Sequence, residues 1–157
     1  MNPLAAILCL LSLAAYIQPG ISKTVQYKIV IKTGDVENAG TDAKVFINLF
    51  GNKGSTGNLI LPGQVTSQFE RGDTDTFTVY GKEVGRLYAI QIGHDNSGEA
   101  PGWYLDYVDV IQTVYAFGKY PRPKNTRYIF RGWIAADEGD GSLSKRLHHG
   151  LISYPDN

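Results

Sequence analysis

Apolar and polar residues alternate along most of the chain, and this alternation predicts β-strands. In the segment from Val25 to Lys32, Val25, Tyr27, Ile29 and Ile31 are separated by mostly polar residues. A period of two over four to eight residues is typical of a strand that buries one face. The same pattern predicts further strands in the ranges 43–50, 77–79, 87–92, 103–113 and 127–133.

Turn-forming residues separate these segments, as in Gly51-Asn52-Lys53-Gly54 and Asn96-Ser97-Gly98. No amphipathic helical period of useful length follows residue 22, and the chain contains 18 glycines and seven prolines. Such a composition favours an all-β, turn-rich fold. We therefore expect an antiparallel β-sandwich in which each sheet buries one face.

The first 22 residues differ from the rest because they carry no charged side chain. An apolar run from Leu4 to Ile17, interrupted only by Ser12, is shorter than the roughly 20 residues that a bilayer-spanning helix needs. Gly20 and Ser22 are small residues suited to a cleavage site before Lys23. We expect residues 1–22 to be a secretory signal peptide and the product to be extracellular, with an uncleaved anchor as the alternative.

Charge and cysteine content exclude several functional classes. The 15 basic and 15 acidic side chains give zero net charge, which argues against a nucleic-acid-binding protein. Cys9 is the single cysteine and lies in the apolar leader, so thiol catalysis and cysteine-based zinc sites are excluded from the cleaved product. The adjacent pair His148-His149 lacks a third ligand in sequence and is a poor zinc signature.

The most informative loop is Asn38-Ala39-Gly40-Thr41-Asp42, which lies between two predicted strands. Calcium takes six to eight oxygens from carboxylates, amides and backbone carbonyls. Asn38 and Asp42 offer side-chain oxygens, and Gly40 allows a tight fold that turns carbonyls inward. The spacing alone leaves two readings open, a calcium site and an ordinary turn.

A second segment, Gly93 to Gly98, contains His94, Asp95 and Ser97. Neighbours in an extended segment point to opposite sides, so His94 and Asp95 cannot face one another as a catalytic pair. The Gly-x-Ser-x-Gly motif of hydrolases does not occur in the sequence. We therefore expect a structural loop and no enzyme, with Asp95 as a further oxygen donor for a metal.

Three apolar residues are candidates for contact with lipid. Leu59 and Ile60 stand beside turn residues, and Trp103 follows Pro101-Gly102. Tryptophan at a loop tip favours the depth of lipid headgroups, although burial in the core is its commoner fate. Both placements stay open from the sequence alone.

Taken together, these segments resemble the PLAT domain (polycystin, lipoxygenase, alpha-toxin), also called the lipoxygenase homology or LH2 domain. The resemblance covers about Val25 to Leu147 and rests on YKIVIKTGDVENAGTDAKVFINLFG, FERGDTDTFTV, IGHDNSGEAPGWYLDYVDV and YIFRGWIAADEGDG. It implies an eight-stranded sandwich of two four-stranded sheets over residues 23–147. Residues 148–157 are then a flexible tail, since the alternation is lost from Ser144 onward.

The resemblance also implies binding rather than catalysis. It gives calcium-ligand roles to the positions matching Asn38, Gly40, Thr41 and Asp42, with Gly40 and Thr41 contributing carbonyls. Ser67 and Gln68 supply no carboxylate where calcium-rich members place an acidic or amide residue just before the phenylalanine matching Phe69, so we expect one weaker ion. The expected function is a secreted, monomeric module that attaches to lipid with the help of calcium. The alternative is an extracellular protein–protein module without calcium or lipid.

Overall fold

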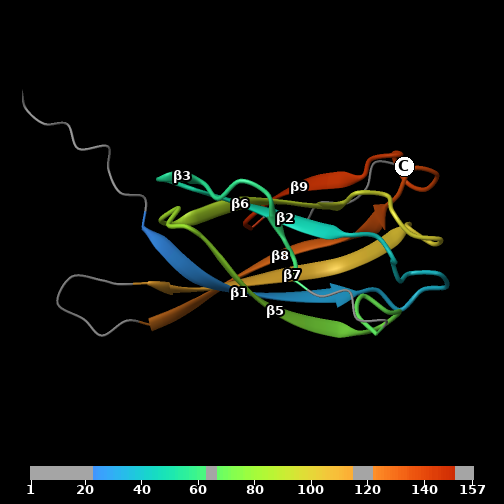
Figure 1. Ribbon diagram of the computed structural model, residues 1–157, viewed down its shortest axis with the longest axis horizontal. Coiled ribbons are helices and arrows are strands. Elements are labelled where there is room, and N and C mark those ends of the chain that lie inside the picture. The colour runs from blue at the N-terminus through green and yellow to red at the C-terminus, as the bar shows by residue number, and fades with distance from the viewer. Residues whose placement is uncertain (1–22, 63–66, 115–121, 151–157) are drawn as a thin grey trace, which may run out of the picture.

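The computed structural model describes residues 23–62, 67–114 and 122–150. Two antiparallel β-sheets lie one over the other (Figure 1). The first sheet has the order β5-β1-β7-β8, with bounds Thr74–Lys82, Thr24–Thr33, Trp103–Val114 and Arg122–Ile134. The second has the order β3-β2-β6-β9, with bounds Gly54–Ser55, Val45–Gly51, Leu87–His94 and Ser144–His148, and β4 (Leu59–Ile60) also pairs with β2.

The predicted antiparallel sandwich is confirmed, with strands at each of the six predicted places. The second sheet has five strands because the two-residue strand β4 pairs with β2 in addition to β3. The expected loss of regular structure from Ser144 is wrong, because Ser144–His148 forms β9 against β6. The predicted signal peptide and residues 151–157 lie outside the described residues. Within the described residues, no helix long and apolar enough to cross a bilayer occurs.

The core lies between the sheets and is built by alternate residues of each strand. Tyr27, Ile29 and Ile31 of β1 are at most 1% exposed, and they belong to one core cluster with the inward residues of β2 and β6. Ile47 and Leu49 of β2 are fully buried. Their outward neighbours are half-buried or exposed, as period-two strands require.

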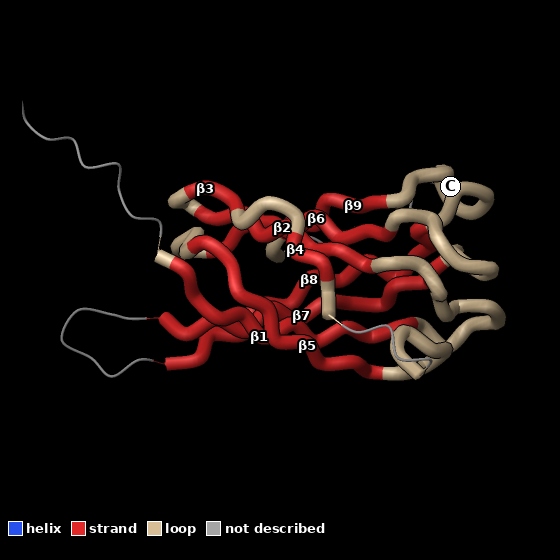
Figure 2. The backbone as a smooth tube through the Cα atoms, viewed as in Figure 1, coloured by secondary structure: helices blue, strands red, loops and turns tan. Residues whose placement is uncertain are grey.

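The antiparallel strands sort the connections to two ends of the sandwich. Four loops, over residues 34–44, 67–73, 95–102 and 135–143, gather at one end, here called the loop end (Figure 2). The turns at 52–53 and 83–86 lie at the other, here called the turn end, together with the starts of β1 and β8. The loop end contains the predicted calcium loop.

Candidate functional site

The loop between β1 and β2 is fastened to its neighbours at several points. Asn38 has a left-handed backbone (φ 57°), which reverses the chain before the buried Ala39. The Ala39 carbonyl accepts a hydrogen bond from the Tyr104 amide at 2.9 Å, and the Thr41 amide donates to the Phe69 carbonyl at 3.3 Å. A Cβ at Gly40 would lie 3.0 Å from that Phe69 carbonyl, so a glycine fits this approach.

Thr41 and Asp42 join this loop to the loop between β6 and β7. The Thr41 hydroxyl donates to the Pro101 carbonyl at 2.8 Å and accepts from the Ala43 amide at 3.1 Å. The Asp42 amide donates to the Ala100 carbonyl at 3.2 Å, and Asp42 Oδ2 accepts from the Ala100 amide at 3.3 Å. The side chain of Thr41 is therefore structural, and Asp42 keeps one carboxylate oxygen without a described partner.

Asp95 lies on the adjoining loop, where its amide donates to the Lys44 carbonyl at 3.1 Å, and Lys44 follows Asp42 by two residues. Its Oδ1 accepts from the amides of Lys44 and Ser97, both at 3.0 Å, and from the Ser97 hydroxyl at 2.5 Å. The hydrogen bond from the Ser97 side chain is the main reason that the pKa of Asp95 is lowered. Asp95 thus closes a local turn with Oδ1, while its Oδ2 has no hydrogen-bond donor in the part of the chain that the structure describes.

The oxygens that remain at the loop end are of the kind calcium prefers. The described residues place no hydrogen-bond donor on the Asn38 amide oxygen, the Gly40 and Thr41 carbonyls or Asp42 Oδ1. Calcium needs six to eight oxygens, so water or a ligand would supply the rest. Among the described residues no cluster of three or more His, Cys, Asp or Glu forms a metal site. The donor set fits one weakly held ion better than a multi-ion site.

The loop end carries an excess of acidic side chains, and this negative charge favours the binding of a cation. Its four loops carry two basic residues, Lys44 and Arg71, and Arg71 is already paired with Asp35 at 2.7 Å. The acidic residues in the same loops are Asp35, Glu37, Asp42, Glu70, Asp73, Asp95, Glu99, Asp137, Glu138 and Asp140. The zero net charge of the chain does not reveal this concentration, because most of the basic residues lie elsewhere in the sequence. The signal was available, since alternate connections of antiparallel strands fall at the same end.

The structure corrects two of the three predicted lipid contacts. Trp103 is not an exposed tip: it is fully buried, and its indole N–H donates to the Thr33 hydroxyl at 3.1 Å. Leu59 is half-buried and packs against the core. Ile60 is 61% exposed, but it pairs with Phe46 of β2 and so lies on the side of the second sheet.

His94 has the structural role expected of it. The ring is 2% exposed, and its Nε2 lies 2.7 Å from the Ile134 carbonyl. Nδ1 accepts a hydrogen bond from the Asn96 amide at 3.2 Å, so Nε2 carries the proton that is donated to Ile134. His94 therefore ties β6 to the end of β8 and is not aimed at a ligand.

Comparison with known proteins gives the family. The model of the PLAT/LH2 domain matches residues 27–123. Lipoxygenase homology domain-containing protein 1 of Mus musculus is 41% identical over 129 residues, which are 81% of this chain and 6% of that protein. Polycystin family receptor for egg jelly, also of Mus musculus, is 39% identical over 115 residues, 73% of this chain and 5% of that protein.

Solved structures agree with this assignment. The structure described as coral 8R-lipoxygenase with "calcium activation via a C2-like domain" has a TM-score of 0.66 and 28% identity over 80% of this chain and 17% of that one. A calcium-dependent 11R-lipoxygenase has a TM-score of 0.63 at 28% identity, over 80% of this chain and 17% of its own. The chain thus spans a small part of each relative, and it belongs to the PLAT/LH2 domain family, whose domain is a non-catalytic module of lipoxygenases and polycystins.

Proposed function

We propose that this PLAT domain is a secreted binding module that attaches to anionic lipid surfaces through calcium held at its loop end. The observation that carries the proposal is a set of oxygens on Asn38, Gly40, Thr41 and Asp42 that receive no hydrogen bond from any described residue and lie among the acidic loops. Relatives described as calcium-activated or calcium-dependent share the fold. The chain's own residues would hold the ion, while the lipid would complete its coordination.

Calcium would change the sign of the interaction with an anionic membrane. Without it, the carboxylates of the loop end repel lipid phosphates over distances within the Debye length of about 8 Å at physiological salt. An ion on Asp42 offsets part of that charge and leaves open positions that a phosphate oxygen can fill. Attachment then requires calcium and weakens as ionic strength rises.

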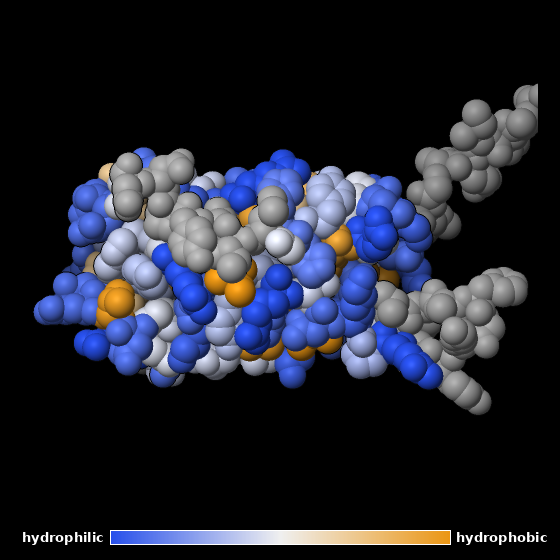
Figure 3. All heavy atoms as spheres, turned by 180° about the vertical axis from the view of Figure 1, so that it is seen from behind, coloured by the Kyte–Doolittle hydropathy of each residue, from blue (hydrophilic) through white to orange (hydrophobic). Residues whose placement is uncertain are grey.

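Insertion of apolar side chains contributes less than the sequence suggested. Trp103 is in the core and Leu59 is half-buried, so Ile60 is the one of the three that is exposed. Burying one large apolar side chain is worth about 1.5–3 kcal/mol, which is too little for permanent attachment. The surface seen in Figure 3 is mostly hydrophilic, with small separate apolar patches. We therefore propose reversible attachment that depends mainly on the ion.

Sedimentation with liposomes tests this function. The protein is expected to sediment with phosphatidylserine vesicles in calcium and to stay in solution with a chelator or with neutral vesicles. Asp42→Asn should abolish the calcium-dependent fraction. Asp137→Asn removes the same charge from another loop at the same end and should bind as the wild type does. Equal binding in calcium and in chelator would contradict the proposal.

A second candidate function is protein–protein binding through the second sheet, without calcium. The outer side of this sheet presents Ile60 next to the half-buried Phe46, and Arg146 stacks over Phe50 with its guanidinium 4.1 Å from the ring centre. Aromatic residues and arginine are enriched in protein interfaces. The test is binding of the purified protein to cell surfaces. If Asp42→Asn binds cells as the wild type does while Ile60→Ser does not, this second function is favoured.

Secretion is part of the proposal and has its own test. The predicted signal peptide implies cleavage after Ser22, because small residues precede Lys23. N-terminal sequencing of protein collected from the culture medium should begin at Lys23. A product that keeps Met1 and stays with the cells would instead favour an anchored protein.

A further inference from the structure

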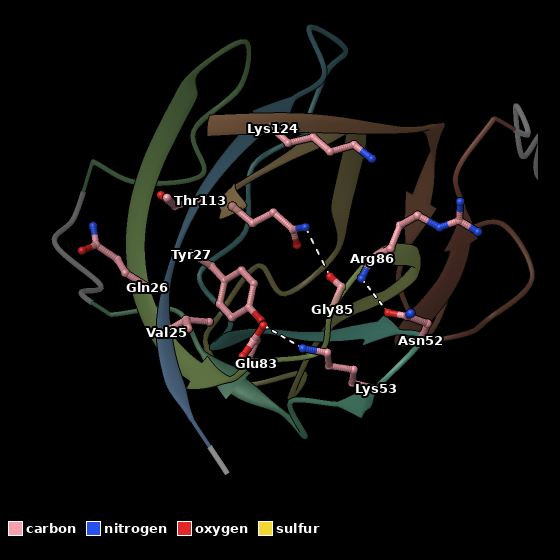
Figure 4. A pocket seen from close by; sticks show the side chains of 11 residues that line it. Val25, Gln26, Tyr27, Asn52, Lys53, Glu83, Gly85, Arg86, Thr113 and Lys124 are labelled. Atoms are coloured by element: carbon pink, nitrogen blue, oxygen red, sulfur yellow. Dashed lines mark hydrogen bonds and ion pairs between the residues drawn. The ribbon is translucent and has the colours of Figure 1, made fainter. Parts of the chain in front are cut away.

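A pocket lies at the turn end of the sandwich, away from the calcium loop (Figure 4). Its volume is about 410 Å³, within the range typical of small-molecule sites. The start of β1, the turn after β2, the turn between β5 and β6, the end of β7 and the start of β8 all contribute to its lining. Tyr27 at the pocket and Thr33 at the loop end are six residues apart on β1, or roughly 20 Å.

Hydrogen bonds hold the walls of this pocket in place. The Tyr27 hydroxyl donates to the Lys82 carbonyl at 2.9 Å and accepts from the Val84 amide at 3.2 Å. The buried Gln112 amide donates to the Gly85 carbonyl at 3.2 Å. Thus side chains of the first sheet fix the turn that carries Glu83 to Arg86.

Further hydrogen bonds join that turn to the one after β2. The Asn52 side-chain oxygen accepts from the Arg86 amide at 2.7 Å, and the Lys53 amide donates to the Val84 carbonyl at 2.9 Å. The two turns therefore form one continuous wall. A pocket whose backbone is fixed in this way needs little reorganisation to bind a ligand.

The charges around the pocket do not balance. Three cationic side chains line it, Lys53, Arg86 and Lys124, against one carboxylate, Glu83. Lys53 is paired with Glu83 at 3.0 Å. Arg86 and Lys124 have no anionic partner among the described residues. The lining therefore carries a net charge of +2.

The surroundings of the pocket strengthen this positive potential. Lys23, Lys82 and Arg122 also lie at the turn end, because Thr24 pairs with Lys82 and Val114 pairs with Arg122. The loop end, in contrast, is acidic. A concave site lined by one sign of charge concentrates ligands of the opposite sign.

We propose that this pocket binds a phosphate monoester without calcium. Such a group carries about −1.5 to −2 charges at neutral pH, which matches the +2 of the lining better than a single carboxylate does. Arginine and lysine are the usual partners of phosphate oxygens. The volume exceeds that of phosphate alone, and the Asn52 side chain at the wall can hydrogen-bond a hydroxylated body esterified to it.

Isothermal titration with sn-glycerol 3-phosphate and with inorganic phosphate, both in chelator, tests the site. Saturable binding is expected in the full chain, weakened by added salt. Arg86→Gln/Lys124→Gln should raise Kd by about tenfold or more, since a hydrogen bond to a charged group is worth about 1.5–3 kcal/mol. Lys28→Gln/Lys44→Gln makes the same charge change on exposed residues outside the pocket and should shift Kd by about twofold at most.

Two further arms identify the source of the phosphate and separate this site from the loop end. Phosphatidylcholine vesicles that contain phosphatidic acid present the same monoester on a membrane. Binding of soluble glycerol phosphate with or without these vesicles supports the pocket, and the vesicles decide whether a lipid headgroup also reaches it. Asp42→Asn should leave the glycerol phosphate titration unchanged even though it disables calcium attachment.

Three results would overturn the proposal that the pocket binds phosphate. The first is no saturable binding of either soluble phosphate at millimolar concentrations. The second is an equal loss of affinity in the Lys28/Lys44 control, which would indicate diffuse attraction. The third is binding to phosphatidic acid vesicles alone, because a charged surface attracts a basic end without any pocket.

Discussion

Asp42 and Ala100 exchange two hydrogen bonds across the loop end: the Asp42 amide donates to the Ala100 carbonyl at 3.2 Å, and the Ala100 amide donates to Asp42 Oδ2 at 3.3 Å. In the proposed calcium site, the same carboxylate would be the main side-chain ligand of the ion. Asp42 therefore joins two loops, and under the proposed function it would also offer an oxygen to a cation. Substitutions at this position have to be chosen so that the two tasks can be separated.

Asp42→Asn should remove most of the calcium-dependent stability and leave the calcium-free protein almost unchanged. The amide side chain keeps an oxygen for the Ala100 amide but loses the negative charge. A ligand at a hundredfold excess over Kd stabilises the native state by about 2.7 kcal/mol. Thermal unfolding with calcium and with chelator measures the difference. Asp42→Ala should lower the melting temperature both with calcium and with chelator, because it also removes the bond to Ala100. If millimolar calcium leaves the melting temperature of the wild type unchanged, the loop is an ordinary turn and not a calcium site.

Trp103→Ala should destabilise the fold by about 3–5 kcal/mol, because it empties a large part of the core. Trp103 is fully buried, and its ring contacts Phe69 edge-on with the centres 5.5 Å apart. Urea unfolding measures the loss. Trp133→Ala is the control, since Trp133 is half-buried on the outer side of the first sheet and should cost less. If Trp103→Ala is as stable as the wild type, Trp103 does not belong to the core and becomes a candidate lipid contact again.

Tyr128→Phe should leave the free energy of unfolding unchanged or raise it. The Tyr128 ring is fully buried, and its hydroxyl has no hydrogen-bond partner among the described residues. Removing an unsatisfied buried hydroxyl relieves a desolvation cost. Tyr27→Phe is the matched control, because that hydroxyl makes two hydrogen bonds and its loss should cost about 1 kcal/mol each. Equal effects in the two variants would show that Tyr128 is bonded after all.

Stability should fall steeply at alkaline pH, partly because of Tyr128. Burial raises the pKa of Tyr128 from 10.0 to about 12. Burial also raises the pKa of Tyr27. Between pH 10 and about pH 12, Tyr128 is deprotonated in the unfolded chain but still protonated in the native state. The free energy of unfolding therefore decreases as pH rises through this range. Denaturant titrations across this range should show a smaller slope in Tyr128→Phe, and an identical slope would place the pKa of Tyr128 near 10.

Much of the fold could be predicted because its strands bury one face. Val25 to Ile31 alternate so regularly that strand β1 follows from the pattern alone. The short strands β3 and β4 were missed because two residues show no period. Strand β9 was missed because Leu147 is its single fully buried residue, and its neighbours Lys145 and Arg146 read as a solvated pair.

The candidate site was predicted less completely. Sequence spacing makes Asp42 a candidate ligand, but it could not reveal that the Ala100 amide donates to one of its carboxylate oxygens, since that bond depends on the packing of two loops. Trp103 illustrates a different limit, because an aromatic residue after Pro-Gly has the same local sequence whether it points outward or into the core. The turn-end pocket was not predicted, since its residues come from five segments with no shared motif.

The position of β1 has a consequence for how this chain acquires its shape during synthesis. β1 emerges from the ribosome before the other strands, yet both of its neighbours in the sheet, β5 and β7, are encoded far downstream. β6 likewise lacks one partner until Leu147 has been made. Strands that wait for distant partners fold slowly and leave unpaired edges meanwhile. We expect the growing chain to rely on chaperones until β9 is in place.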